Sequence, residues 1–142
     1  MSLVLFLPLT AHALRVGLIQ ALAPMGSLVV DFISKDPWQM VLVEQGPWAD
    51  VPSNLRRVQD RLYSCLDAAI DGQLAELFPG SAGAAVTVRL DCYNVPEDAI
   101  GQFFRSFASA VLDLPAYKSA LEASPHVSAI QFAINLGDGA GL

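Results

Sequence analysis

The chain has 142 residues, of which 54% are hydrophobic and 15% are charged, and its formal net charge at pH 7 is −6. This composition excludes intrinsic disorder, and the length suits one domain with its own core. The basic residues form no positive stripe, because Arg56, Arg57 and Arg61 lie beside Asp60, so we expect no nucleic-acid partner. The apolar excess indicates a thick core, together with a homo-oligomeric interface or an ordered apolar arm.

Residues 1–26 form an apolar N-terminal arm that has several interpretations. Leu3–Leu9 reads LVLFLPL and is followed by Ala11-His12-Ala13, which has the form of a signal-peptidase site. No Lys or Arg precedes this run, however, and it is too short to span a bilayer. We expect either a strand at Leu3–Leu9 and a helix at Ala11–Ala23, or an upstream extension with the original start at Met25, and the two are compatible.

Residues 27–136 have the pattern of a single α+β domain, and the glycine-rich residues 137–142 are expected to be a flexible tail. Two apolar runs, Leu28–Ser34 and Gln39–Glu44, open the domain. Turn signals follow each of them, at Lys35-Asp36-Pro37 and Gly46-Pro47. The two runs lie close enough in sequence to predict a β-hairpin.

A long amphipathic helix is predicted from about Ser53 to Asp71, with Gly72 after its end. A third strand, Ala85–Cys92, follows it and alternates between two faces. One face carries Val86, Val88, Leu90 and Cys92, and the other carries Thr87, Arg89, Asp91 and Tyr93. The first set is expected to line the core. The helix is expected to bury the stripe formed by Leu55, Val58, Leu62, Leu66, Ala69 and Ile70.

A second helix is expected to begin at Asn94, which would cap it together with Glu97 three residues later. Pro115 interrupts this helix, and a short helix resumes at Ala116–Ala123. A last strand is predicted at Val127–Leu136. The buried stripe of the second helix consists of Ile100, Phe103, Phe104, Phe107 and Val111, and that of the strand consists of Ile130, Phe132, Ile134 and Leu136.

These elements predict an α+β fold with a β-β-α-β-α-β core, in which helices cover one face of a single mixed or antiparallel sheet. If the N-terminal strand and helix are included, the first six elements read β-α-β-β-α-β, which is the ferredoxin-like order. No internal repeat or linker divides the chain.

No residues have the spacing of a catalytic, metal or cofactor site. Cys65 and Cys92 are far apart and belong to no CxxC pair, so both are expected to be buried free thiols. His12 and His126 have no acidic or cysteine partner nearby in sequence. The glycine-rich segment at residues 80–84 follows a helix and precedes a strand, which is the reverse of a phosphate-binding loop.

The candidate binding residues project from the side of the sheet that faces away from the core. Arg89, Asp91 and Tyr93 alternate along the third strand and would lie near Gln131 of the last strand if that sheet face is open. Such a set is either a solvated Arg–Asp pair or a polar patch for a protein or small ligand. Trp48, after the second strand, is expected to cover a core edge or to anchor an interface.

One further pattern runs from about Leu28 to Leu90, namely a strand pair, a Trp, a long helix carrying a Gln, and a Gly before a third strand. The residues that carry it are Val30-Asp31-Phe32-Ile33, Trp48, Leu55, Gln59, Gly72, Pro79 and Val86. The pattern resembles that of a group of small uncharacterised bacterial domains. This resemblance implies a bacterial protein of unknown function and brings no catalytic residues.

Two functions are compatible with these features. The first is a non-enzymatic, cytoplasmic and homodimeric protein-binding module, which serves as an adaptor, a chaperone-like factor or an immunity-type protein. In it, residues 1–24 are expected to contribute to a homodimer contact or to edge-strand pairing. The second is a small-ligand-binding or enzymatic domain in which Arg89, Asp91, Tyr93 and His126 converge in a cleft. No cofactor, metal, nucleic acid or membrane is expected in either case.

Overall fold

In the computed structural model, which describes residues 30–137, the main strands and helices follow the predicted order β-β-α-β-α-β. Further short helices occur within the two long connections. The expectations for the N-terminal arm and for residues 138–142 lie outside the described residues. Most of the predicted α+β domain, residues 27–136, lies within the described residues.

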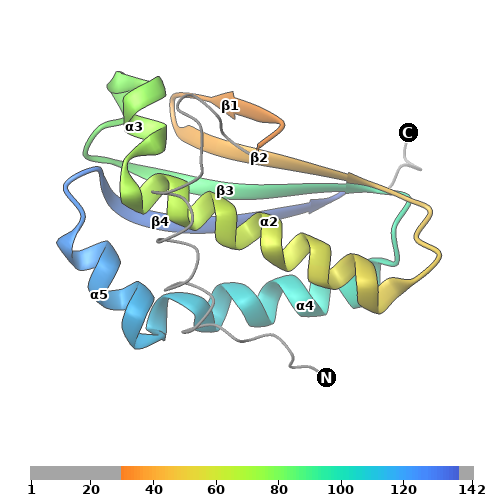
Figure 1. Ribbon diagram of the computed structural model, residues 1–142. Helices are drawn as coiled ribbons and strands as arrows, with labels where there is room; N and C mark the ends of the chain where they lie inside the picture. Colours follow the sequence, from red (N-terminus) through yellow and green to blue (C-terminus); the bar gives the residue numbers. More distant parts are fainter. Residues whose placement is uncertain (1–29, 138–142) are drawn as a thin grey trace.

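The four strands lie side by side in chain order (Figure 1). They are β1 (Phe32–Ser34), β2 (Trp38–Gln45), β3 (Ala84–Tyr93) and β4 (Val127–Leu136). The hairpin partners β1 and β2 are antiparallel, whereas β2, β3 and β4 are parallel to one another. The sheet is therefore mixed, which is one of the two alternatives that the sequence left open, and the α+β class is confirmed.

Two crossovers connect the parallel strands. β2 leads into α2 (Val51–Asp71) and β3 leads into α4 (Glu97–Ala110), and each helix returns the chain to the next strand. Figure 1 shows α2, α4 and the shorter α5 (Pro115–Ala123) on the same side of the sheet. Crossovers of one hand between successive strands place their helices on one face, as expected from the sequence.

The strand neighbours differ from a ferredoxin-like arrangement. In that fold another strand separates the two strands that a helix joins. Here α2 joins β2 and β3, which pair directly along the whole of β2, from Trp38 with Val86 to Gln45 with Tyr93. The N-terminal strand and helix that suggested the ferredoxin-like order lie outside residues 30–137.

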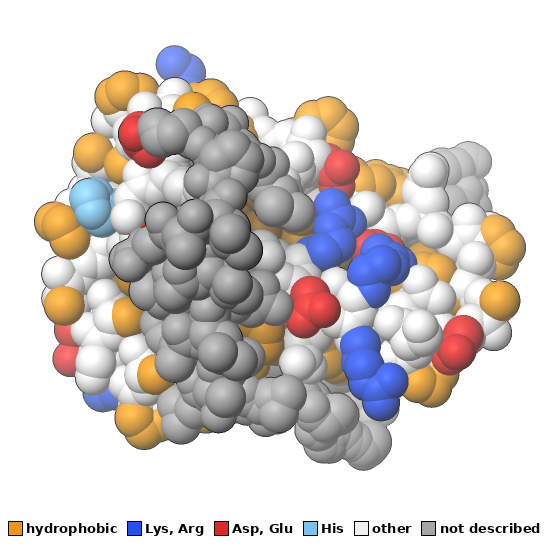
Figure 2. Space-filling model, viewed as in Figure 1, with side chains coloured by type: hydrophobic (Ala, Val, Ile, Leu, Met, Phe, Trp, Pro, Cys, Tyr) orange, Lys and Arg blue, Asp and Glu red, His pale blue; other side chains and the backbone are white. Residues whose placement is uncertain are grey.

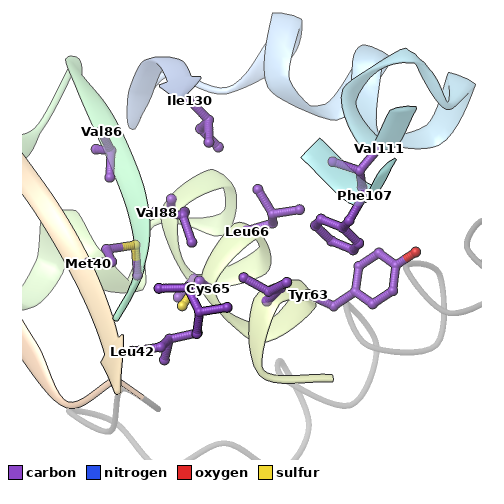
Figure 3. Packing of buried hydrophobic residues seen from close by; sticks show 14 of the residues in the cluster. Met40, Leu42, Tyr63, Cys65, Leu66, Val86, Val88, Phe107, Val111 and Ile130 are labelled. Carbon is purple, nitrogen blue, oxygen red and sulfur yellow. The ribbon is translucent and has the colours of Figure 1, made fainter. Parts of the chain in front are cut away.

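The core lies between the sheet and the helices. The predicted stripe of β3 is buried, with exposed fractions of 1% or less for Val86, Val88, Leu90 and Cys92. Figure 3 shows Leu66 of α2 between Val88 of β3 and Phe107 of α4. Phe104 and Phe107 are both buried, as the helical spacing predicted. The side chains Phe132, Ile134 and Leu136 are half-buried because β4 forms an edge of the sheet.

Helix α2 begins two residues earlier than predicted. Asp50 caps it by accepting a hydrogen bond from the backbone N–H of Ser53 (3.2 Å), and a proline follows in the first turn. The helix ends where expected, at Gly72, whose φ is 102°. The ring of His126 packs there, and a Cβ on residue 72 would lie 2.9 Å from its Nε2. Glycine is therefore required for both conformation and space.

The predicted capping box of α4 is wrong. Asn94 has a φ of 58° and turns the chain at the end of β3, and α4 begins only at Glu97 after Pro96, without a side-chain cap. Asparagine tolerates this left-handed conformation better than most residues. Glu97 and Asp98 instead place negative charge in the first turn, where the helix dipole favours it.

A short helix, α3 (Gln73–Leu77), and a 3₁₀ turn, η2 (Pro79–Ser81), lead from α2 to β3. A second 3₁₀ turn, η3 (Val111–Asp113), separates α4 from α5. Helix α5 is tied to α2 through the buried hydroxyl of Tyr117, which donates a hydrogen bond to Asp67 (2.9 Å). This bond satisfies a carboxylate oxygen inside an otherwise apolar interface.

Candidate functional site

The side of the sheet opposite α2, α4 and α5, here called the open face, carries the predicted binding residues. The strand register places residues of neighbouring strands side by side in rows across this face. One row consists of Phe32, Val41, Arg89 and Ala133, one residue from each strand. The open face consists of Phe32, Ser34, Gln39, Val41, Val43, Gln45, Thr87, Arg89, Asp91, Tyr93, Gln131, Ala133 and Asn135. Polar and apolar side chains are mixed on it.

Arg89 is at the centre of this face. Its Nε and Nη2 donate to the two carboxylate oxygens of Asp91 (2.9 and 2.8 Å), and its Nη1 donates to Gln39 Oε1 (2.8 Å). The hydrogen bonds to Asp91 raise the pKa of Arg89 above its ordinary value. The Asp91 side chain is 7% exposed, whereas that of Arg89 is 37% exposed. The guanidinium is thus fixed in place and still reachable from solvent.

The other predicted residues lie at different distances from this centre. Gln131 pairs in register with Thr87 and is exposed, one row away from Arg89. Tyr93 ends β3 and packs on Gly137, where a Cβ would lie 2.9 Å from the ring. Trp48 belongs to the loop between β2 and α2 and packs against the core. Its indole Nε1 is buried and has no hydrogen-bond partner within residues 30–137.

His126 lies away from these groups. It precedes β4, whose first residue, Val127, pairs with Ala84 at the start of β3. Tyr93 is at the other end of the same strand, so the length of β3 separates the imidazole from it. His126 instead packs on Gly72, and its backbone carbonyl accepts a hydrogen bond from Gly83 (3.0 Å). The structure therefore does not bring the four residues of the enzymatic alternative together.

Sequence reasoning missed a charged cluster between β2 and α2. Glu44, with a side chain 2% exposed, accepts two hydrogen bonds from Arg57 and one from Arg61, all at 2.7 Å. Arg61 also donates to Asp31 (2.8 Å). A signal for this cluster existed, because Glu44 follows Met40 and Leu42 on the core-facing side of β2 and a buried carboxylate needs a cationic partner.

The arginines of this cluster are neutralised by the carboxylates that they hold. In the view of Figure 2, basic side chains near α2 alternate with acidic ones. This arrangement agrees with the expectation that the basic residues of α2 form no positive stripe. The Nη1 and Nη2 atoms of Arg57 and Arg61 already donate hydrogen bonds to the carboxylates of Glu44 or Asp31.

Neither cysteine is placed for nucleophilic chemistry. Cys65 and Cys92 are both free and buried, as the sequence predicted. Burial raises the pKa of each thiol to about 12, so neither forms a thiolate readily at neutral pH. Within residues 30–137, no group of three or more His, Cys, Asp or Glu side chains is arranged to hold a metal ion.

A pocket of about 480 Å³ opens between α4 and β4. Residues 104, 105, 108 and 109 of α4 and Gln131–Ile134 of β4 line it. Of the predicted binding residues it includes Gln131 but not Arg89, Asp91, Tyr93 or Trp48. The open face and the pocket are therefore two adjacent surfaces that share two residues of β4, Gln131 and Ala133.

Comparison with protein-family models, with curated proteins and with solved structures finds no match for this chain. The resemblance to small bacterial domains thus stays an expectation from sequence. In the part of the chain that the structure describes, no helix is both long and apolar enough to cross a membrane.

Proposed function

We propose that the chain is a non-enzymatic protein-binding module that binds a partner protein through the open face. The observation that carries this proposal is Arg89, held by Asp91 and Gln39 at the centre of a surface that is partly apolar. Phe32, in the same row, is 60% exposed. Arginine and aromatic side chains are enriched at protein interfaces.

The fixed geometry of Arg89 supports binding. A long side chain that is already held loses little conformational freedom when a partner arrives, so less of the interaction energy is spent on ordering it. The same hydrogen bonds count against a role for Asp91 as a general base, because both carboxylate oxygens already accept hydrogen bonds from Arg89.

The test compares partner capture by three forms of the full chain, immobilised and exposed to extract of the source organism. Phe32→Asp places a charge in the open face. Leu77→Asp makes the same change at a 36% exposed apolar residue of α3, outside that face. We expect a discrete protein retained by the wild type and by the Leu77 variant but reduced about tenfold by Phe32→Asp. Equal retention by all three would refute the role of the open face.

The proposal includes a cytoplasmic location and a second copy of the chain. The two free thiols support a reducing compartment. The apolar run at Leu3–Leu9 supports self-association, because such a segment is an aggregation hazard unless it is covered. We propose that residues 1–24 contribute to a homodimer contact or to edge-strand pairing.

A chain shortened to begin at Met25 tests the homodimer. Light scattering should give a dimer for the full chain and a monomer for the shortened one, with a lower melting temperature for the latter. If both chains have the same oligomeric state and the same melting temperature, the N-terminal arm has no role in assembly.

A further inference from the structure

Strand β4 forms an edge of the sheet without the features that usually protect such edges. It is ten residues long and contains neither a charged residue nor a proline. The opposite edge, β1, has three residues and runs into Lys35, Asp36 and Pro37. Within residues 30–137 no strand pairs with the outer side of β4. Its outward N–H and C=O groups can therefore accept another strand.

The pocket between α4 and β4 opens beside this edge and has an apolar floor. Phe104 is 2% exposed and meets the half-buried ring of Phe132 edge to face, with 6.2 Å between ring centroids. Phe107 contacts Phe132 in the same way at 6.0 Å. Ala108 and Ala133 are small, which leaves the volume of the pocket open. An apolar side chain from a strand beside β4 would enter it.

Arg105 gives the pocket a positive rim. The residue is exposed, and its guanidinium lies over Gly101, where a Cβ would be 3.2 Å from Nη1. Arg57, Arg61 and Arg89 each hold a carboxylate, but Arg105 pairs with none in the described part of the chain. An unpaired arginine beside an apolar pocket and a free strand edge is suited to a carboxylate on the incoming segment.

The N-terminal arm does not supply that carboxylate. Residues 1–29 contain no Asp or Glu, so the N-terminal arm cannot pair with Arg105. A second copy added through β4 about a two-fold axis would bring two identical edges together, and neither edge strand carries an acidic residue for Arg105. Positive rims of two copies repel each other where they approach, which disfavours such a contact.

We propose that β4 and α4 form a second docking site, distinct from the open face, for an extended internal segment of another protein. The segment pairs with the edge of β4, places an apolar side chain on Phe132, and presents an Asp or Glu to Arg105. The segment is internal because Arg105 and Phe132 lie beside the middle of β4, so the edge continues past the pocket in both directions. This mode of recognition adds a strand to a sheet.

The test uses a display library of random segments about nine residues long, flanked on both sides by flexible linkers so that neither terminus is free. The library is panned against the full chain. The site predicts enriched segments that carry an Asp or Glu with apolar residues two positions away. Enrichment of segments without an acid, or no enrichment at all, would overturn the proposal.

The leading segment is then synthesised with blocked termini and titrated into variants. Arg105→Gln should weaken binding about tenfold, the usual scale for losing one charge-assisted hydrogen bond. Arg56→Gln, which removes another exposed arginine, on α2, should leave the affinity unchanged. Equal affinity for the wild type and Arg105→Gln would refute the pairing, as would a chain that dimerises through β4 and excludes the segment. Phe32→Asp should not affect this affinity, which separates the site from the open face.

Discussion

Glu44 is one of the buried charged residues in the described part of the chain. It is a carboxylate in a core-facing position of β2, and two arginines make its burial possible. Removing one partner of a buried ion pair leaves uncompensated charge, whereas removing an exposed partner costs little. Asp31, which is 40% exposed and also bound to Arg61, offers the matched comparison.

Glu44→Ala should therefore lower the free energy of unfolding by about 3 kcal/mol. Asp31→Ala should lower it by less than about 1 kcal/mol. Urea denaturation at neutral pH measures both. Losses of the same size in the two variants would show that burial does not distinguish these carboxylates.

The thiols of Cys65 and Cys92 should be unreactive in the folded protein. With a pKa of about 12, each thiol is ionised in only about one molecule in ten thousand at about pH 8. We expect a disulfide reagent to react with neither thiol within minutes in the native state and with both in denaturant. Rapid reaction of a native thiol would contradict the burial of Cys65 or Cys92.

Helix α4 packs several phenylalanine side chains against the core, and these differ in how deeply they are buried. Phe107 is fully buried and contacts Tyr63 and Phe132, whereas Phe103 is only half-buried. Phe107→Ala should cost about 3–5 kcal/mol, because it removes the ring and leaves a cavity. Phe103→Ala should cost clearly less. Thermal melts of the two variants give the ranking, and a reversed order would contradict the assigned face of α4.

Local pattern was sufficient to predict the main strands and helices but not the short helix α3 or the 3₁₀ turns. The alternation of Val86, Val88 and Leu90 identified the buried face of β3, and the spacing of Leu62, Leu66 and Ile70 identified that of α2. The start of α4 could not be predicted in the same way. Asn94 suits both a helix cap and a left-handed turn, and the end of β3 decides between them.

Sequence patterns could not predict which distant strands and helices would lie next to each other. Nothing in β2 or β3 alone specifies that they run parallel as direct neighbours. The bonds from Arg57 and Arg61 to Glu44, and the contact of α4 with β4 around the pocket, follow from that pairing. Arg89, Asp91 and Tyr93 could be predicted on the open face, and Gln131 beside them, because residues two apart on a strand project from one face.

For the molecule as a whole, Asp31 connects the start of β1 with β2 and α2. Burial favours a higher pKa for Asp31, but the hydrogen bonds from the N–H of Val43 and from Arg61 hold that pKa below its ordinary value. A depressed folded pKa adds stability that is present above the unfolded pKa of about 4 and is lost as the pH falls through the folded value.

The difference in unfolding free energy between the wild type and Asp31→Asn should therefore be larger at pH 7 than at about pH 3. Asp113→Asn, at an exposed carboxylate of η3 for which no ion pair is found among the described residues, is the control for the loss of one negative charge. A constant difference for Asp31→Asn across this range would refute the linkage.

The most direct test of the central claim, that the open face binds a partner protein, is methyl NMR of the full chain titrated with the protein that it captures. Thr87, Val43 and Ala133 place their methyl groups on the open face, while Leu42 and Val88 on the same strands face the core. We predict that the partner shifts the first set and leaves the second unchanged. Shifts confined to residues near His126, or no shifts on the open face at saturation, would contradict the claim.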